Sequence, residues 1–326
     1  MEICILKLGA IGDVVRTIPI IEAIKEKYPN SSVTWITKPM CREILEGNKN
    51  INEILTIPCE VNKEFDILYS VDIDETATQL SSKIKAKEKY GYYYMDGFPA
   101  SFNPEAEYYL NTIFDDELKK SNRKTYQEMI FEALKLKYKK QKIKLFINES
   151  ARKFAHDFLE KNNLKGKRLL GINIGSSPRW PSKAWALEKL EEFVPEARKK
   201  GYEIVLIWGP EEQEAIENLS SRLKIKGIKV YKTDTRDSLK NFFALVDICD
   251  KVISADSLAL HTSLALNKPT IGLFFCTPPH EIEGYGLLKK IVSPMLKDFF
   301  PEKMDQYDKD LVNSISVKEV LDALRD

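Results

Sequence analysis

The feature that most constrains the fold is an alternation of strand and helix that occurs twice along the chain. Ile3–Leu8 is a short apolar run closed by Gly9, and apolar residues then recur at helical spacing over Val14–Lys27. The same order restarts at Arg168–Ile174, with a helix predicted over Leu187–Lys200. Strands separated by helices pair in parallel as βαβ units. The sequence therefore predicts an α/β fold of two Rossmann-like halves, each with a parallel sheet.

The stretch between the two halves is less regular. Tyr90–Asn103 is rich in Tyr, Gly and Pro and predicts a loop, whereas Glu149–Glu160 predicts a helix. Asn162–Lys167 is short and polar, so we place the domain boundary there, with one domain over residues 1–162 and a second over 163–310. Ligands of parallel sheets bind beyond the carboxyl ends of the strands. We therefore expect the two sheets to face a central cleft that holds a small molecule.

Composition excludes several classes of protein. The 50 Lys and Arg residues are balanced by 49 Asp and Glu, so the net charge of +1 gives no overall field and predicts no nucleic-acid partner. The five cysteines form no C-x-x-C pair, which is typical of a reducing cytoplasm. The first residues do not resemble a signal peptide, and no apolar run is long enough to span a membrane. These observations predict a cytoplasmic protein.

The first strand–helix turn reads Gly9-Ala10-Ile11-Gly12-Asp13. Its glycines allow a tight turn and the close approach of a ligand. Two interpretations of Asp13 are open, because an aspartate at this place can be a helix N-cap or a general base. The turn lacks the G-x-G-x-x-G pattern of dinucleotide-binding proteins, which disfavours a nicotinamide-dependent dehydrogenase.

Two strand ends in the second half suit an anion. Gly175 leads into Ser176 and Ser177, and Lys183 follows, so hydroxyl groups and a cation accompany backbone donors, as a phosphate requires. A solvated loop with packed tryptophans is the simpler interpretation. The segment is not a Walker loop, because G-x-x-x-x-G-K-[ST] is absent.

A later strand runs directly into Asp256 and Ser257, where a helix carrying His261 begins. The N–H groups of a helix start favour an anion such as a pyrophosphate. Asp256 could instead be a cap, and His261 a packed residue. Glu211, Glu212 and Glu214 follow another strand end, either to complement the helix dipole or to hold a ribose.

These segments, taken in order, resemble the heptosyltransferase family, glycosyltransferase family 9. The resemblance extends from residue 5 to about residue 286. The matching segments are Leu8–Asp13 followed by Thr17-x-Pro19, Gly175-x-x-x-Arg179 through Lys183-x-Trp185, Trp208-Gly209-Pro210 with its trailing glutamates, and Asp256-Ser257-x-x-x-His261. The resemblance implies a GT-B fold whose second half binds a nucleotide sugar and whose first half binds the acceptor. It also implies that a final helix, within residues 311–326, crosses back to the first domain.

The resemblance implies roles for individual residues. Asp13 would be the catalytic base, and Lys183 would assist catalysis at the donor phosphates. The implied donor-binding residues are Ser176, Ser177, Lys183, Glu212, Asp256, Ser257, Leu258 and His261, and the implied acceptor-side loop contains Gly9, Gly12 and Arg16. Two positions depart from the family pattern: Leu258 stands where glycine is usual, and Ala186 replaces a common proline. Both leave every charged group in place, so activity is expected.

The implied reaction is an inverting, metal-independent transfer of heptose from ADP-heptose to a lipopolysaccharide-core or related glycan acceptor. No cofactor is expected beyond this nucleotide-sugar co-substrate. A glycolipid acceptor would bring the protein to the inner face of the cytoplasmic membrane, where the basic run Lys135–Lys144 could assist unless it is only a solvated turn. Three alternatives stay open: a GT-B-like sugar-nucleotide epimerase, a non-catalytic sugar or nucleotide binding protein, and an inactive paralogue.

Overall fold

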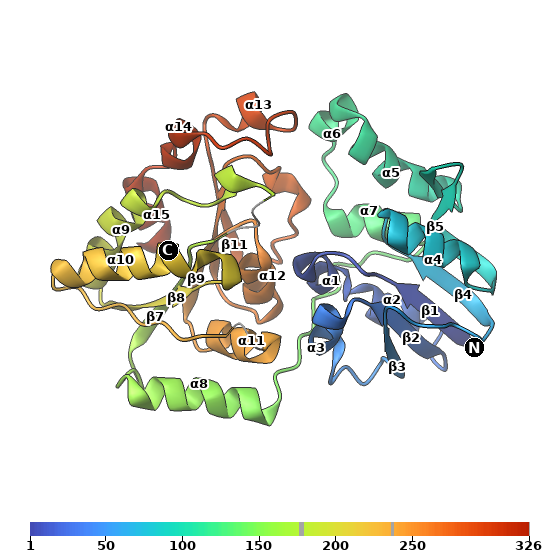
Figure 1. The fold of residues 1–326 in the computed structure, drawn as a ribbon, viewed down its shortest axis with the longest axis horizontal. Coiled ribbons are helices and arrows are strands. Elements are labelled where there is room, and N and C mark those ends of the chain that lie inside the picture. Colours follow the sequence, from blue (N-terminus) through green and yellow to red (C-terminus); the bar gives the residue numbers. More distant parts are fainter. Residues whose placement is uncertain (176–178, 236–237, 326) are drawn as a thin grey trace. The chain divides into compact units, whose positions relative to one another are not determined.

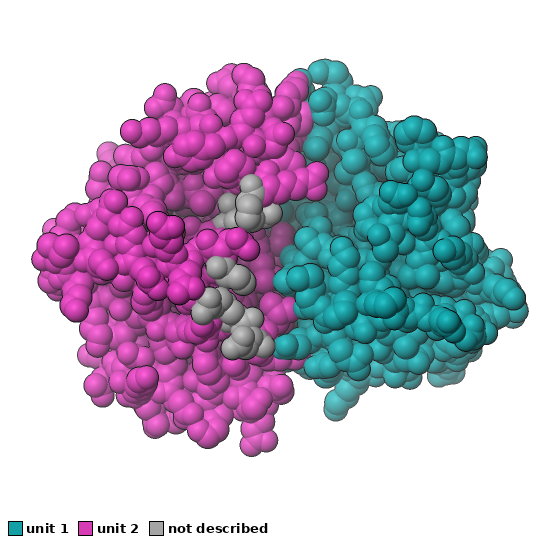
Figure 2. Space-filling view, in the orientation of Figure 1, with its two compact units in different colours: residues 1–146, 280–283 teal, residues 147–279, 284–326 magenta. Residues whose placement is uncertain are grey.

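The computed structural model describes residues 1–175, 179–235 and 238–325. The chain divides into two compact units, coloured separately in Figure 2. Unit 1 comprises Met1–Phe146 together with His280–Glu283, and unit 2 comprises Ile147–Pro279 and Gly284–Asp326. The predicted boundary at Asn162–Lys167 lies later than the observed division. The difference is one helix, α8 (Glu149–Lys161), which packs on α11 (Leu239–Asp247) within unit 2.

Unit 1 is built on a six-stranded sheet in the order β3-β2-β1-β4-β5-β6 (Figure 1). All neighbouring strands are parallel except β5 and β6. The strands are β1 (Glu2–Leu6), β2 (Ser32–Thr37), β3 (Glu53–Thr56), β4 (Phe65–Ser70), β5 (Ala86–Met95) and β6 (Phe98–Ser101). The chain crosses from β3 back to β4 on the other side of β1. The carboxyl ends of β1 and β4 therefore meet where the strand order reverses, which is the usual ligand position in such sheets.

Two local predictions for unit 1 are wrong. Tyr90–Asn103 is not a loop but most of a hairpin, in which β5 and β6 are joined through Asp96 and Gly97, both at positive φ. Aromatic residues favour strands, and Pro99 is tolerated because β6 is an edge strand. The single helix expected over Val14–Lys27 is divided into α1 (Ile11–Thr17) and α2 (Ile20–Lys27), because Pro19 has no N–H to continue the first helix.

Two of the remaining helices of unit 1 precede the hairpin in the chain, and three follow it. Asp115 and Thr125 cap α6 and α7 with their side chains, and α6 was not predicted from the sequence. These helices are α3 (Arg42–Leu45), α4 (Glu75–Lys83), α5 (Glu107–Phe114), α6 (Asp116–Ser121) and α7 (Tyr126–Ala133), with 3₁₀ turns at Pro39–Cys41 and Pro104–Ala106.

Unit 2 carries a five-stranded parallel sheet in the order β11-β10-β9-β7-β8. Its strands are β7 (Arg168–Asn173), β8 (Tyr202–Ile207), β9 (Lys251–Ala255), β10 (Thr270–Phe274) and β11 (Leu288–Val292). The strand expected over Ile228–Tyr231 is reduced to one parallel bridge between Tyr231 and Val205. If Tyr231 is counted as an edge strand beside β8, the strand order of unit 2 is the same as that of unit 1. β7 then takes the place of β1, and β9 takes the place of β4.

Helices cover both faces of the unit 2 sheet. Figure 1 shows α8 and α11 side by side, whereas α9 contacts both α10 and α15. The final helix α15 belongs to unit 2, where it packs on α9, β10 and β11. The family resemblance implied that this helix would cross back to the first domain instead. The other helices are α9 (Leu187–Lys199), α10 (Gln213–Ile225), α12 (Leu258–Ala265), α13 (Leu296–Phe299), α14 (Lys309–Asn313) and α15 (Val317–Arg325), with 3₁₀ turns at Pro181–Lys183, Pro210–Glu212 and Pro279–Glu281.

The core of unit 2 explains why its amphipathic helices form. Leu190 and Phe193 of α9, Leu219 of α10 and Val320 of α15 all join one buried apolar cluster with the sheet. Each such buried side chain stabilises the fold by roughly 1.5–3 kcal/mol relative to exposure. Within the described residues, no helix is both long and apolar enough to cross a membrane.

Candidate functional site

In unit 1 the turn after β1 brings Asp13 into the first turn of α1. The N-cap of this helix is Ala10, which offers no side-chain cap, so Asp13 is not the N-cap residue. Its carboxylate instead forms an ion pair with Arg16, with Oδ1 2.9 Å from Nη2. The Asp13 side chain is 36% exposed and that of Arg16 only 16%. The geometry leaves part of this carboxylate accessible to solvent and holds it beside a cation.

Arg16 is held in turn by α7. Its guanidinium lies over the ring of Tyr126, 3.7 Å from the ring centre. The Tyr126 hydroxyl is 2.8 Å from Thr17 Oγ1, and the Thr17 hydroxyl donates to the backbone oxygen of Asp13. Burial raises the pKa of Tyr126, which favours the neutral phenol in this contact. The helix carrying Asp13 is thus fixed against α7, while the predicted loop residue Gly12 lies within α1 itself.

Sequence reasoning missed two charged residues beside this turn. Lys7, directly after β1, forms a buried ion pair with Asp72, which lies just beyond β4. A Cβ on Gly9 would lie only 2.7 Å from Lys7 Nζ, so this glycine leaves room for the ammonium group. The available signal was the position of Asp72 directly past a predicted strand, at the sheet edge where ligands bind.

In unit 2 the structure brings together Lys183, Asp256 and His261. Lys183 Nζ lies 3.3 Å from Asp256 Oδ2, and His261 Nε2 lies 3.6 Å from Asp256 Oδ1. All three side chains are less than 20% exposed. Asp256 therefore does not cap α12 but pairs with a cation from the loop after β7. This arrangement holds the lysine beside the start of α12.

The start of α12 has the properties of an anion site. Ser257 is its N-cap residue, but the Ser257 hydroxyl makes no side-chain cap hydrogen bond; it lies 3.1 Å from Asn173 Nδ2 and 3.0 Å from the Ser254 hydroxyl. Residues Ala259–Ala265 are all buried, so the helix dipole is poorly screened by water. Leu258, the first helical residue, is partly buried. Asn173 and Ser254 were missed because they act through hydrogen bonds between separate strand ends.

The three candidate glutamates are distinguished by their positions. Glu211 and Glu214 are exposed. Glu212 folds back so that its carboxylate accepts the Gly209 N–H at 2.7 Å. It also packs over Gly175, where a Cβ would lie 2.1 Å from Glu212 Cδ. Glu212 thus joins the ends of β7 and β8, and a capping role for it is present whether or not it also meets a ribose.

Replacing Glu212 with Gln should remove one component of the pH dependence of stability. Burial raises the pKa of Glu212 above its ordinary 4.5, and this outweighs the hydrogen bond from Gly209. The folded state therefore keeps the Glu212 proton to higher pH than the unfolded state does. The contribution of Glu212 to the free energy of unfolding thus falls as pH rises from the unfolded-state pKa through the folded-state pKa. Urea unfolding from about pH 4 to about pH 7 should show wild type losing stability relative to Glu212→Gln. The control is Glu214→Gln, which changes an exposed carboxylate. The prediction would be contradicted if the difference in free energy of unfolding between wild type and Glu212→Gln did not change with pH.

The other residues of the predicted donor loop differ in what the structure shows of them. Ser176 and Ser177 lie outside the described residues. Trp185 is a packing residue, because its indole N–H donates to the Ile315 oxygen at 3.1 Å and its ring meets that of Phe193. Ser182 is buried and bonds to the backbone of Gln306. The loop from Pro181 onward is therefore anchored in unit 2, which fixes the backbone of Lys183.

Three of the six lysines in the basic run of unit 1 form ion pairs with glutamates. Lys139 and Lys144 form ion pairs with Glu26 and Glu22 of α2, both at 2.6 Å, and Lys135 pairs with Glu105 at 2.9 Å. Surface pairs of this kind contribute about 0–1 kcal/mol each. Their effect here is to compensate charge locally, which favours the interpretation of the run as a surface segment.

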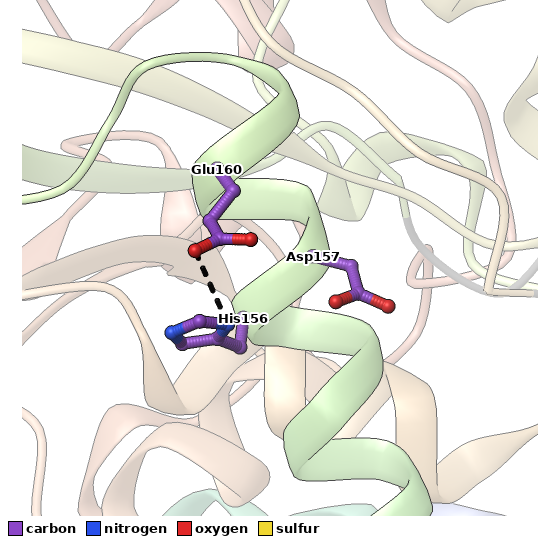
Figure 3. A group of neighbouring side chains, drawn as sticks. All are labelled: His156, Asp157 and Glu160. Carbon is purple, nitrogen blue, oxygen red and sulfur yellow. Dashed lines mark ion pairs between the residues drawn. The ribbon is translucent and has the colours of Figure 1, made fainter.

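One other group of potential metal ligands occurs among the described residues. His156, Asp157 and Glu160 lie close together on the exposed face of α8, as Figure 3 shows. Two lysines already pair with its carboxylates: Lys165 with Glu160 at 2.6 Å and Lys153 with Asp157 at 2.5 Å. An exposed and already compensated group of this kind does not indicate a metal site.

Comparison with known proteins agrees with this architecture. The chain is 26% identical over 307 residues to the lipopolysaccharide core heptosyltransferase OpsX of Haemophilus influenzae, covering 90% of this chain and 84% of that protein. A family 9 glycosyltransferase structure from Veillonella parvula has a TM-score of 0.78 at 19% identity, covering 99% and 96% of the two chains. ADP-heptose lps heptosyltransferase II of E. coli has a TM-score of 0.68 at 16% identity, covering 100% and 98%.

The solved structures confirm the predicted GT-B fold of two α/β units with parallel sheets. The model of glycosyltransferase family 9 (heptosyltransferase) matches residues 62–305, which include Lys183, Asp256 and His261 but not the turn that carries Asp13. This match covers most of the chain. The protein therefore belongs to glycosyltransferase family 9 and is a glycosyltransferase.

Proposed function

We propose that the protein transfers a heptosyl group from ADP-heptose to a lipopolysaccharide-core or related glycan acceptor, with inversion at the anomeric carbon. The observation that carries this proposal is the arrangement of Lys183, Asp256 and the start of α12 in a chain of this family. Support for the donor and acceptor comes from the relatives, whose names specify ADP-heptose and the lipopolysaccharide core.

Unit 2 would bind the nucleotide sugar. Lys183 and the first N–H groups of α12 would contact its diphosphate, since both offer positive charge to the same place. Asp256 would hold Lys183 in position and, with His261, would meet the diphosphate or the sugar. Glu212 is the proposed ribose contact, and Ser176 and Ser177 stay predictions for the phosphates.

Unit 1 would supply the base. In the proposed step, the oxygen of an acceptor hydroxyl forms a bond to the anomeric carbon while the bond from that carbon to the diphosphate oxygen breaks. The hydroxyl proton passes to the Asp13 carboxylate, and the bonding electron pair leaves with ADP. Arg16 would orient Asp13 from 2.9 Å away. The transition state resembles an oxocarbenium ion.

The charge that develops on the leaving ADP would be stabilised by Lys183 and α12. These groups would supply the positive charge that a divalent cation provides in other transferases, so we propose a metal-independent reaction. A glycolipid acceptor would place the protein at the inner face of the cytoplasmic membrane. Because three lysines of the basic run are paired with glutamates, we do not assign the membrane contact to that run.

Titration with nucleotides tests the donor. We expect ADP to bind at least about tenfold more tightly than UDP or GDP, measured by calorimetry, since a tenfold preference corresponds to only about 1.4 kcal/mol. ADP-heptose should then be consumed only when a glycan acceptor is present. A new sugar nucleotide formed without acceptor would instead indicate an epimerase. Binding without consumption under either condition would indicate an inactive paralogue, in which Leu258 is the first residue to replace with Gly.

A further inference from the structure

A buried ion pair lies at the start of the turn that carries Asp13. Lys7 Nζ pairs with Asp72 Oδ1, and the two side chains are only 5% and 6% exposed. Burial lowers the pKa of Lys7, but the attraction of Asp72 and neighbouring groups outweighs it, so the pKa of Lys7 lies well above its ordinary value. The Lys7 ammonium group is therefore charged. At this exposure neither side chain is placed to bind a substrate directly, and the proposed reaction uses neither of them.

The second oxygen of Asp72 holds the backbone of the turn. Asp72 Oδ2 accepts the N–H groups of Leu8 and of Gly9, the latter at 2.8 Å. On the preceding residue, the Lys7 carbonyl oxygen lies 3.4 Å from the Trp35 indole nitrogen, which donates to it. One carboxylate therefore bonds to three consecutive residues, through one side chain and two backbone groups. This is more than charge compensation requires.

The turn sets the position of Asp13. Gly9 is followed by Ala10, whose carbonyl oxygen accepts the Asp13 N–H at 2.9 Å. Since α1 begins at this turn, a shift of Leu8 and Gly9 would move the start of the helix and with it the Asp13 carboxylate. We propose that Lys7 and Asp72 are positioning residues for Asp13, which they fix through the backbone of the intervening turn. The inference rests on the proposed role of Asp13 as base.

The pair also balances the charge around Asp13. The titratable groups described around this region are Lys7 and Asp72 from the strand ends, Arg16 from α1, Tyr109 and Tyr126 from α5 and α7, Tyr92 from β5, and Cys41, whose thiol contacts the Leu8 and Gly9 carbonyl oxygens. Loss of the Asp72 charge would leave an uncompensated cation and lower the pKa of Asp13. Loss of the Lys7 charge would leave an uncompensated anion and raise it. Removal of either charge should therefore move the pKa of Asp13, in a direction that depends on which charge is lost.

The experiment compares Asp72→Asn, Lys7→Met and the double variant with wild type. For each single variant we expect kcat to fall by about 10²-fold, as misplacement of a catalytic group by about 1 Å can cause, with the affinity for ADP changed less than about twofold. The acidic limb of the kcat–pH profile should move to lower pH in Asp72→Asn and to higher pH in Lys7→Met. In the double variant the limb should return to its wild-type position, while kcat stays low.

Asp66→Asn is the matched control. Asp66 lies at the other end of β4, where it also accepts a backbone N–H, from Glu2, and pairs with a lysine, Lys87. Loss of this carboxylate should leave kcat and its pH profile unchanged. Three results would overturn the inference. The first is an equal fall of kcat in Asp66→Asn, and the second is an unchanged kcat in folded Asp72→Asn. The third is a shift of the acidic limb in the same direction in both single variants.

Two further measurements keep the result decisive. If a single variant fails to fold because a buried charge has lost its partner, the double variant, which leaves no such charge, should still show low kcat. Amide hydrogen exchange reports the turn without activity: Leu8 and Gly9 should lose protection in Asp72→Asn but not in Asp66→Asn, and retained protection overturns the inference. A wild-type protein that transfers no sugar would refute the proposed function. Hydrogen exchange at Leu8 and Gly9 would still test whether Asp72 fixes the turn.

Discussion

Asp13→Asn should lower kcat by about 10²–10⁴-fold, the usual contribution of a general base. The amide of Asn cannot accept the proton of the acceptor hydroxyl, although it matches the carboxylate in shape and can still accept a hydrogen bond from Arg16, 2.9 Å away. ADP affinity should not change, because the groups proposed to bind the diphosphate belong to unit 2. Steady-state kinetics and calorimetry on the same preparation separate the two effects.

The control for this variant is Asp116→Asn, which removes an exposed carboxylate from α6 of the same unit. It should behave like wild type in both assays. Asp13→Asn with wild-type kcat would exclude the base role, and loss of ADP affinity together with kcat would show that the residue acts in donor binding instead. The side-chain capping role is already excluded, since Ala10 is the N-cap residue of α1.

Lys183→Ala should weaken ADP binding by about 10–100-fold. A charge-assisted hydrogen bond contributes about 1.5–3 kcal/mol, and the variant also removes the Lys183 cation from beside Asp256 at the start of α12. The remaining carboxylate would repel the diphosphate. We therefore expect kcat to fall as well, because the charge on the leaving ADP grows in the transition state.

Calorimetry with ADP and with adenosine tests the origin of the effect. Adenosine binding should be unchanged in Lys183→Ala, because the lost interaction is with the phosphates. The double variant Lys183→Ala/Asp256→Asn should recover part of the ADP affinity by removing the repulsion. Lys224→Ala, an exposed lysine on α10, is the control. Equal ADP affinity in wild type and Lys183→Ala would remove Lys183 from the proposed site.

The sequence predicted those parts of the fold and candidate site that depend on neighbouring residues. Asp256, Ser257 and His261 lie within six consecutive residues at the start of α12, so their order along the chain already implied that they would be close. Parallel strands were predicted from continuous apolar runs such as Ile3–Leu8, which are buried on both faces of β1.

What the sequence could not predict depends on contacts between distant segments. Lys7 and Asp72 are 65 residues apart, and only the crossover from β3 to β4 brings the two strand ends together. The early boundary between the units has the same cause, because α8 follows unit 1 in sequence but packs on α11. The β5–β6 hairpin was missed because Gly91, at positive φ within β5, and Pro99 suggested a loop.

The common strand order of the two units gives Asp72 and Asp256 equivalent places, each just past the strand that follows the crossover. Each pairs with a lysine from the neighbouring strand end or its loop. The Asp72 side chain is only 6% exposed and bonds to backbone, whereas that of Asp256 is 17% exposed, beside a helix start without a side-chain cap. The same acid–lysine pair thus occurs at equivalent places in the two units. In unit 1 the pair is buried and holds the backbone of a turn, whereas in unit 2 it is less buried, where we propose that it meets the diphosphate.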